Sequence, residues 1–499
     1  MQLRRTKIIA TLGPATDSNE VIRDVIAAGA DVLRINLSHG TSEEQMARAA
    51  QVREVARDLK KEVALLADLR GPKVRIEEFA DDTVVLRSGD TFVLDAAAEP
   101  PPGSQTGIGV TYKDLPGDIA PGDLLLLDDG LLSMRVVEIK DTKIICEVKT
   151  GGVLGNRKGI NVLGGGLSLP GIAPHDIQDI PRVAAMGVDY VAVSFPRNAA
   201  DMNEARRRLR AAGSQARLVA KIERTEAIEN LDQIILASDV VLIARGDLGV
   251  EIGDAELPGL QKLITSKALE HNRVVITATQ MMQSMVQNPI PTRAEVLDVA
   301  NAVFDGTDAV MLSAETAIGR HPKAVVKAMH RICLGAERHE DTTPDVDQLN
   351  VQFERIDQAI AMAAMFMATH VSVQAIVALT ESGSTAQWLS RVRSAVPIFA
   401  LSPLAASRYR MALYRGVYSV AHDFPGDDVE KALVEGVQLL VRQGYIKAGD
   451  RIILSMGEHT GNEGGTNTLR LLQVGEGGQA DISQSLNTAI SPQGSTVLL

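Results

Sequence analysis

Three ionisable residues in the middle of the chain have types and spacing that suit catalysis. The stretch VAKIERTE places Lys221 two residues before Glu223, so both side chains point to the same side of an extended strand. Asp247 ends the next apolar run, and two carboxylates with no histidine or cysteine nearby suit a hard cation such as Mg²⁺ or Mn²⁺. An ammonium group beside a divalent cation is what phosphoryl transfer needs. The alternative is a structural Lys-Glu-Asp ion-pair network that fills the end of the fold.

Further polar residues follow other apolar runs. Arg34, in LRINLSHG, is a candidate phosphate clamp because its planar guanidinium matches phosphate, whereas His39 is as easily an ordinary hydrogen-bonded histidine. Gly246 allows close backbone approach, so its amide could bind a substrate carboxylate. Thr279, with Ser313 and Glu315 one strand further on, could relay a proton.

Eight short apolar runs precede these polar residues, and each is followed by an amphipathic helical stretch. In an eight-stranded (β/α)8 TIM barrel, the carboxyl ends of all strands meet on one face, so these groups would converge on one pocket. An open sheet would scatter them, and polar residues can also simply mark strand ends. We expect the barrel, with strands in KIIATLG, DVLRINLSHG, VALLADLRG, YVAVSFPR, RLVAKIER, VVLIARGD, RVVITATQ and AVMLSAET.

The spacing of the runs indicates a large insertion after the third strand. The segments RSGDTFVLD, PGDLLLLDDG and TKIICEVKT read as a small antiparallel β domain, which could serve as a lid that excludes water. After the polar break EDTTPDVD, a helix in IDQAIAMAAMFMAT and strands in AIVALTES, PIFALS and RIILSMGE indicate a second α/β domain. The expected domains are the barrel in two parts (1–71 and 171–344), the inserted β lid (72–170), a carboxyl-terminal α/β domain (345–474) and a disordered tail (475–499).

Composition limits the partners of the chain. Its 499 residues carry a net charge of −12, which argues against general binding to nucleic acid or anionic membranes. Cys146 and Cys333 are too far apart for a metal-binding or redox pair, and no apolar run reaches the ~18 residues of a membrane helix. The start MQLRRTKIIATLGPATD lacks the apolar core of a signal peptide, so we expect a cytoplasmic protein.

Many of these segments together resemble the pyruvate kinase family, in its bacterial form with a short amino terminus. The resemblance runs through KIIATLGPA, RINLSHG, GPKVR, RKGIN, AKIER and ARGDLGVEI, and it is most specific in the long block from Ile276 to Thr316. It implies Mg²⁺-dependent phosphoryl transfer from phosphoenolpyruvate to ADP, giving pyruvate and ATP in the final step of glycolysis. It also implies a regulatory carboxyl-terminal domain and a homotetramer.

The resemblance also implies roles for individual residues of this chain. Lys221 would stabilise the transferring phosphoryl group, and Glu223 and Asp247 would hold Mg²⁺. Gly246 and Thr279 would contact phosphoenolpyruvate or its enolate, with Thr279 near the carbon that is protonated. Phosphate and nucleotide contacts are expected from Arg34, Arg75, Asn36, His39 and, in the lid, Lys158.

The chain differs from the family at one position of a potassium site. Many members bind K⁺ at positions that match Asn36, Ser38, Asp68 and Leu69, with a glutamate where this chain has Lys73. Because a lysine ammonium is a tethered monovalent cation, we hypothesise that Lys73 replaces K⁺ and that catalysis needs little or no K⁺. The alternative is that Lys73 pairs with Asp68 or Glu77 and has no bearing on potassium.

The loop LTESGSTA in the last domain suggests an anion site. Resemblance implies a phosphorylated effector there, a sugar phosphate or a nucleotide, although a plain helix N-cap explains the same residues. The candidates are Thr380, Ser382, Gly383, Ser384 and Thr385.

Two other functions are open on the residues alone. One is a different Mg²⁺-dependent barrel acting on enolates, such as an aldolase or a phosphoenolpyruvate mutase-like enzyme, which would explain neither the lid nor Lys158. The other is a catalytically silent sensor of sugar phosphates, which would not need Lys221, Glu223, Asp247 and Thr279 together.

Overall fold

The computed structural model describes residues 3–340, 353, 355–392, 394–423, 429–457 and 465–476. The chain divides into two compact units, the first made of residues 1–341 and 408–416 and the second of residues 342–407 and 417–499. The expected boundary near residue 344 and all but the first two residues of the expected tail lie outside the described residues. No helix in the described part of the chain is long and apolar enough to cross a membrane.

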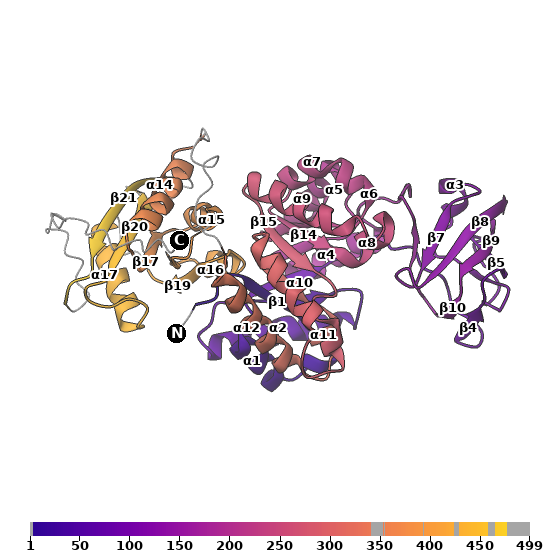
Figure 1. Cartoon of the computed structure of the whole chain (residues 1–499), viewed down its shortest axis with the longest axis horizontal. Coiled ribbons are helices and arrows are strands. Elements are labelled where there is room, and N and C mark those ends of the chain that lie inside the picture. The colour runs from indigo at the N-terminus through magenta and orange to yellow at the C-terminus, as the bar shows by residue number, and fades with distance from the viewer. Residues whose placement is uncertain are drawn as a thin grey trace, which may run out of the picture. The chain divides into compact units, whose positions relative to one another are not determined.

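The first unit contains a closed barrel of eight parallel strands, in the order β1-β16-β15-β14-β13-β12-β3-β2 (Figure 1). All eight expected strands are present, so the predicted barrel is confirmed. Nearly every residue in them is buried, as expected for parallel strands covered on both faces. The strands are β1 (Lys7–Thr11), β2 (Val32–Asn36), β3 (Ala64–Asp68), β12 (Tyr190–Val193), β13 (Arg217–Ile222), β14 (Val240–Ala244), β15 (Val274–Ala278) and β16 (Ala309–Leu312).

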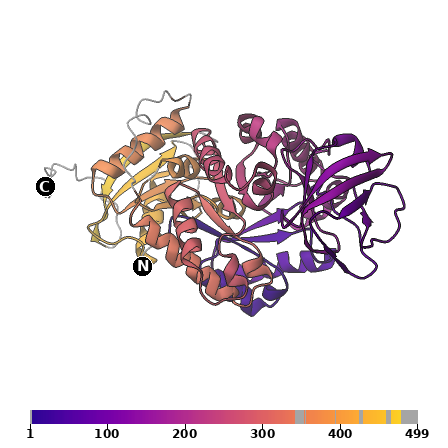
Figure 2. The same ribbon diagram turned by 45° about the vertical axis from the view of Figure 1, so that its right-hand side comes forward.

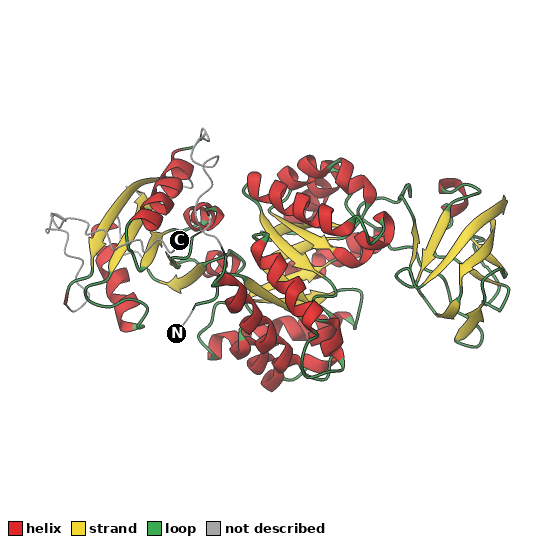
Figure 3. Ribbon diagram, in the orientation of Figure 1, coloured by secondary structure: helices red, strands yellow, loops and turns green. Residues whose placement is uncertain are grey.

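Helices surround the barrel, as Figure 3 shows in red around the yellow strands. Several begin at a side-chain cap: Thr41 and Glu44 form a capping box on α2, and Thr292 and Glu295 form one on α10. The helices are α1 (Asn19–Ala28), α2 (Ser42–Asp58), α4 (Pro174–Ala185), α5 (Ala199–Ala211), α6 (Thr225–Glu229), α7 (Leu231–Ala237), α8 (Arg245–Ile252), α9 (Leu257–Glu270), α10 (Arg293–Phe304), α11 (Ala314–Ala317) and α12 (Pro322–Glu337), with short 3₁₀ turns η1 (Pro14–Thr16) and η2 (Gln283–Val286).

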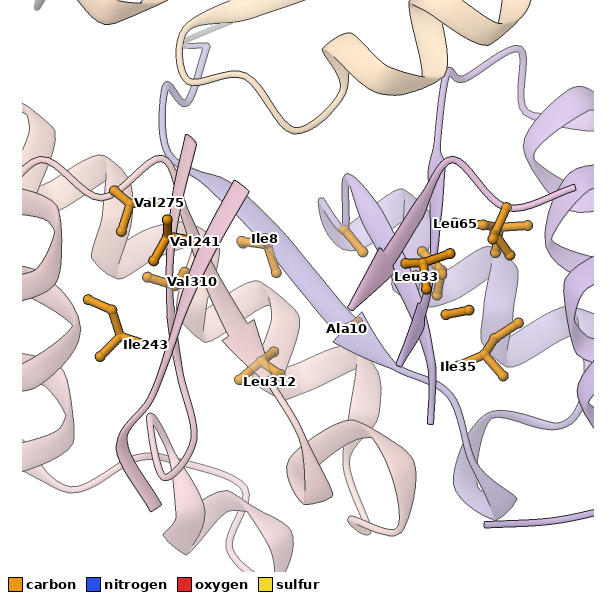
Figure 4. Packing of buried hydrophobic residues seen from close by; sticks show 14 of the residues in the cluster. Ile8, Ala10, Leu33, Ile35, Leu65, Val241, Ile243, Val275, Val310 and Leu312 are labelled. Carbon is orange, nitrogen blue, oxygen red and sulfur yellow. The ribbon is translucent and has the colours of Figure 1, made fainter. Parts of the chain in front are cut away.

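The main apolar core lies between the strands and these helices. Figure 4 shows alternate strand residues such as Leu33 and Ile35 on β2 and Val241 and Ile243 on β14, which belong to the same buried cluster as residues of the surrounding helices. Because side chains alternate along a strand, the intervening residues must point into the barrel. Arg34 lies between Leu33 and Ile35, so the pattern of the core directs it inward.

An inserted β domain follows β3. It has a core of its own and forms a two-stranded sheet, β10-β4, and a six-stranded sheet, β11-β7-β8-β9-β5-β6. Its strands are drawn in purple in Figure 2. The pairings are antiparallel except that β5 and β6 run parallel, which the expectation of an antiparallel domain missed. Its elements are β4 (Thr83–Leu86), β5 (Thr91–Asp95), β6 (Gly107–Gly109), α3 (Leu115–Asp118), β7 (Leu124–Leu127), β8 (Leu132–Lys140), β9 (Lys143–Thr150), β10 (Gly152–Gly155) and β11 (Ile160–Val162).

The second unit is an α/β domain built on a five-stranded sheet, β19-β18-β17-β20-β21. The expected α/β class is confirmed, but two of its strands, β19 (Val417–Ala421) and the antiparallel edge strand β21 (Thr466–Gln473), were not predicted. The remaining elements of this part of the chain are α14 (Ile356–His370), β17 (Ala375–Leu379), α15 (Ser384–Arg391), β18 (Ile398–Ser402), α16 (Ala405–Met411), α17 (Val429–Arg442) and β20 (Arg451–Gly457).

Candidate active site

A polar pocket of about 170 Å³ opens at the carboxyl ends of the barrel strands. It brings together residues that are widely separated in the sequence and that come from most of the strands. Its lining includes these predicted site residues: Arg34, Asn36, Ser38, His39, Asp68, Leu69, Lys73, Arg75, Lys221, Glu223, Asp247 and Thr279.

Lys221 lies at the centre of a buried polar cluster. Its ammonium donates to Ser194 Oγ at 2.8 Å, and it lies 2.9 Å from Glu223 Oε1 and 3.4 Å from Asp68 Oδ1. Burial alone would lower the pKa of Lys221, but Asp68 and Glu223 outweigh that effect and raise it. Lys221 is therefore a permanent positive charge inside the pocket.

Arg34 and Asp68 form a second buried pair beside Lys221. The guanidinium donates from Nε at 2.8 Å and from Nη2 at 2.6 Å to Asp68 Oδ2, and from Nη1 at 3.0 Å to Thr11 Oγ1. Burial by itself would raise the pKa of Asp68, but Lys221 and Arg34 together lower it, so its carboxylate is ionised. Asp68 thereby orients two cations toward the pocket.

Lys73 pairs with neither partner that the sequence suggested. Its ammonium lies 2.7 Å from Asp247 Oδ1 and 3.6 Å from Asp129 Oδ1, whereas Glu77 pairs with Lys113 at 3.0 Å. The predicted pairing of Lys73 with Asp68 or Glu77 is therefore wrong. Arg34 and Lys221 already neutralise Asp68, and Lys113 already pairs with Glu77. Burial would lower the pKa of Lys73, but Asp247 raises it, so this lysine is charged.

The two carboxylates proposed for a metal lie close enough to influence each other. Burial raises the pKa of Glu223, and repulsion from Asp247 adds to the rise while Lys221 opposes it. No group of three or more possible His, Cys, Asp or Glu ligands occurs in the described ranges. The protein thus offers two carboxylates, which fits Mg²⁺ or Mn²⁺ because such ions take their remaining ligands from substrate and water.

Gly246 and Thr279 meet on the next two strand ends. The Gly246 amide donates to Thr279 Oγ1 at 2.8 Å, and that hydroxyl donates to the Ala278 carbonyl at 2.7 Å. Thr279 has φ 64°, a left-handed conformation that costs energy in a non-glycine residue and that recurs at functional sites. The amide that we expected to bind a substrate carboxylate is thus occupied by a neighbouring side chain.

Glu315 is not brought to the pocket, although it was a candidate for a proton relay. It is fully buried and accepts hydrogen bonds from the Met282 amide at 3.1 Å and the Ser313 amide at 2.7 Å. These bonds link the loops that follow β15 and β16. Its role is therefore structural, and only Ser313 of that pair lines the pocket.

The candidate nucleotide residues divide into two groups. His39 and Arg75 line the pocket, and burial, Arg75 and Arg34 all lower the pKa of His39, which favours its neutral form. Lys158 does not line the pocket: its ammonium lies 2.9 Å from Asp128 Oδ1 on the inserted domain. The sequence could not show this pairing, because both residues lie in loops without a regular period.

The candidate effector residues surround the start of α15 in the second unit. The Gly383 amide donates to Thr380 Oγ1 at 3.0 Å, and the Thr385 hydroxyl lies 2.6 Å from that of Thr466 on β21. The Ser384 amide also donates locally, to Ser382 Oγ at 3.3 Å. Gly383 has φ 87°, which favours glycine at this position. Local capping therefore accounts for part of this cluster.

Two pocket residues had no assigned role in the sequence. Ser194 accepts from Lys221 and donates to the Leu69 carbonyl at 2.8 Å, so it connects two strand ends. Phe195, at φ 57°, donates its amide to Glu223 Oε2 at 2.9 Å. The polar end of YVAVSFPR indicated that this strand contributes residues to the pocket. Only the fold shows that Ser194 and Phe195 orient Lys221 and Glu223.

Known proteins resemble the chain over nearly its whole length. The family model for the pyruvate kinase barrel domain matches residues 3–326, and that for the pyruvate kinase alpha/beta domain matches residues 358–472. Pyruvate kinase II of Salmonella typhimurium is 52% identical over 477 residues, which cover 95% of this chain and 99% of that protein. A pyruvate kinase of Haemophilus influenzae is 48% identical over 479 residues, with 95% and 99% covered, and one of Geobacillus stearothermophilus is 40% identical over 472 residues, with 94% and 80% covered. The chain belongs to the pyruvate kinase family of transferases.

Proposed function

We propose that the protein transfers the phosphoryl group of phosphoenolpyruvate to ADP, giving pyruvate and ATP in the final step of glycolysis, with Mg²⁺ or Mn²⁺ as cofactor. The observation that carries this proposal is the buried Lys221 ammonium, held by Asp68, Glu223 and Ser194 in the pocket at the strand ends. A phosphoryl group entering this pocket meets fixed positive charge from two sides, because Arg34 lies on the other side of Asp68.

Each step of the reaction has a candidate residue. The bond between phosphorus and the enol oxygen breaks while a β-phosphate oxygen of ADP bonds to phosphorus, and Lys221 and Arg34 neutralise the charge on the moving group. The enolate left behind must then take a proton on carbon, and Thr279 is our candidate for the hydroxyl beside that carbon. Gly246 is proposed as the backbone contact for the same substrate, which requires that its amide release the Thr279 hydroxyl when substrate binds.

The divalent cation would be held by Glu223 and Asp247 together with substrate oxygens. When bound, it supplies Lewis-acid stabilisation of negative charge on phosphoryl and enolate oxygens. Asn36, His39 and Arg75 are proposed for the nucleotide, together with Lys158 if the inserted domain moves toward the pocket. Domain closure of this kind excludes water from phosphoryl transfer.

We further propose that the enzyme works without K⁺, because Lys73 carries a fixed cation into the same pocket as the potassium-site positions Asn36, Ser38, Asp68 and Leu69. The Lys73 charge lies against Asp247, so it would act from the side of the metal carboxylates. Asn36, Ser38, Asp68 and Leu69 would then hold no potassium ion, and Asp68 would serve to orient Arg34 and Lys221.

The remaining proposals rest on the sequence and on the family. We propose a cytoplasmic homotetramer, with a barrel in residues 1–71 and 171–344, a lid in 72–170 and a regulatory domain in 345–474. Activation by a sugar phosphate or nucleotide would act at Thr380, Ser382, Gly383, Ser384 and Thr385.

The test is pyruvate formation from phosphoenolpyruvate and ADP with Mg²⁺, in wild type and in Lys221→Met. We expect activity in the wild type and a loss of about 100- to 1000-fold in the variant, the usual effect of removing one fixed electrostatic contact to a transition state. Lys267→Met is the matched control, because that lysine pairs with Asp232 at the surface of the barrel helices. Pyruvate formation that does not need ADP would point instead to an enolate barrel, and no reaction at all would point to a sensor.

A further inference from the structure

Arg245 is a buried arginine to which the reaction above gives no role. It begins α8, directly after Ala244 at the end of β14, and its side chain is 10% exposed. Ala244 lines the pocket, whereas Arg245 does not. Because neighbouring side chains of a strand point to opposite sides, the guanidinium leaves the pocket side and reaches toward the surrounding helices. A charge in such a place needs several partners to offset its lost hydration.

The partners of Arg245 come from a strand end and two helices. Its Nε donates to the Ala278 carbonyl at 3.1 Å, and its Nη2 donates to the Thr279 carbonyl at 2.8 Å. The two terminal nitrogens also bind both carboxylate oxygens of Asp298 on α10, at 2.7 and 2.8 Å. Nη1 further donates to Gln261 Oε1 on α9 at 3.3 Å. A guanidinium has five N–H donors, and these five oxygens engage all of them, so the side chain is fixed in one orientation.

The two carbonyl groups that Arg245 holds flank a strained residue. Thr279 has φ 64°, and Gln280 after it has φ 55°. A positive φ is an outlier for a β-branched residue and persists only where the surroundings hold it. The φ angle of Thr279 is the torsion between the carbonyl carbons of Ala278 and Thr279. The contacts of Arg245 with these two carbonyl groups therefore hold Thr279 in its left-handed conformation.

The conformation of Thr279 decides where its hydroxyl lies. Oγ1 accepts from the Gly246 amide at 2.8 Å and donates to the Ala278 carbonyl at 2.7 Å. With the backbone on both sides held by Arg245, this hydroxyl can leave the Gly246 amide by rotation of one side chain, without a movement of the loop. It then stays at the pocket, which Thr279 lines and where the proposed reaction needs it.

We propose that Arg245 is a positioning residue for the protonation of the enolate, because it fixes the backbone on both sides of Thr279. Asp298 on α10 orients Arg245 in turn, so a residue outside the pocket also contributes to this step. The proposal rests on the proposed function in one respect, that the Thr279 hydroxyl serves the protonation.

The experiment follows the protonation step in the reverse direction. Run backwards, this step takes a proton from the methyl carbon of pyruvate, so in D₂O with Mg²⁺ and ATP the methyl group gains deuterium, which NMR measures. Arg245→Lys cannot hold two carbonyl groups at once and should lower both deuterium uptake and kcat by about 10- to 100-fold. The KM values for phosphoenolpyruvate and ADP should stay nearly unchanged, because Arg245 does not line the pocket. Asp298→Asn keeps the guanidinium and should lower both rates by up to about tenfold.

A double-mutant cycle and a matched control separate positioning from a general effect on the fold. Deuterium uptake in the double variant of Arg245→Lys and Thr279→Val should be no lower than in Thr279→Val alone, because both changes act on the same hydroxyl. Arg206→Lys is the control, since that arginine also binds a carboxylate, Asp239 at 3.1 Å, and a backbone carbonyl, that of Ala237 at 2.9 Å. Losses that multiply in the double variant, or a fall in kcat with unchanged deuterium uptake, would overturn the proposal.

Amide hydrogen exchange supplies a readout that is independent of turnover. In Asp298→Asn the Gly246 amide, which donates to Thr279 Oγ1, should exchange about tenfold faster, while the core strands keep their protection. Arg206→Lys should leave that amide unchanged. Unchanged exchange at Gly246 in both Asp298→Asn and Arg245→Lys would overturn the proposal. Exchange that changes as expected in an enzyme that makes no pyruvate would uphold Arg245 as the residue that holds Thr279 and refute the proposed reaction instead.

Discussion

Replacement of Lys73 by methionine tests whether this side chain stands in for a potassium ion. Methionine keeps a flexible unbranched side chain of similar length and removes only the charge. We expect the variant to lose activity in buffer without K⁺ and to regain part of it when KCl is added. The wild type should respond little to KCl.

The size of the effect follows from the geometry of Lys73. Its ammonium lies 2.7 Å from Asp247 Oδ1, and at an effective dielectric constant of about 20 two unit charges at that distance interact by about 6 kcal/mol. Lys73 is one-fifth exposed, and its desolvation opposes the attraction, so about 1 to 3 kcal/mol is the expected net contribution. That range corresponds to a fall of about 10- to 100-fold in kcat/KM without K⁺.

The assay is pyruvate formation from phosphoenolpyruvate and ADP with Mg²⁺, in tetramethylammonium buffer with and without KCl. Lys113→Met is the matched control, because that lysine also belongs to the inserted domain and pairs with Glu77 at 3.0 Å. The reasoning about Lys73 is refuted if Lys73→Met is as active as the wild type without K⁺. Strong activation of the wild type by KCl would refute it equally.

Three further predictions concern Arg34, Glu251 and the metal. Arg34→Lys loses the two-pronged contact with Asp68 Oδ2, so the KM for phosphoenolpyruvate should rise about tenfold in steady-state assays, and an unchanged KM would rule out Arg34 as a phosphate contact. Burial raises the pKa of Glu251 to about 7 from 4.5, so the folded state binds the proton more tightly and the wild type should lose up to about 3 kcal/mol of stability between pH 4.5 and 7. Urea unfolding across that range should show this loss to be absent from Glu251→Gln, and parallel pH curves would contradict it. Chelation of Mg²⁺ should abolish activity but leave the melting temperature nearly unchanged, because Lys221 and Lys73 already neutralise Glu223 and Asp247. A large fall in the melting temperature on chelation would show that the metal also stabilises the fold.

The sequence by itself determined the barrel and the polar residues that lie at its strand ends. Eight apolar runs followed by polar residues predict parallel strands whose ends converge. The spacing of Lys221 and Glu223 also predicts that these two side chains lie on the same side. These properties depend on local periodicity, which is written in neighbouring residues.

Only the tertiary structure decided which charged groups pair. Lys73 meets Asp247 across 174 positions of sequence, and Lys221 lies 3.4 Å from Asp68 on another strand of the barrel. The period of side chains along a strand indicates which residues share a side, but it does not identify the segment that packs against them. That partner is selected by the closure of the barrel and by the path of the inserted chain, and for this reason the local sequence suggested Asp68 or Glu77 for Lys73 where the fold supplies Asp247.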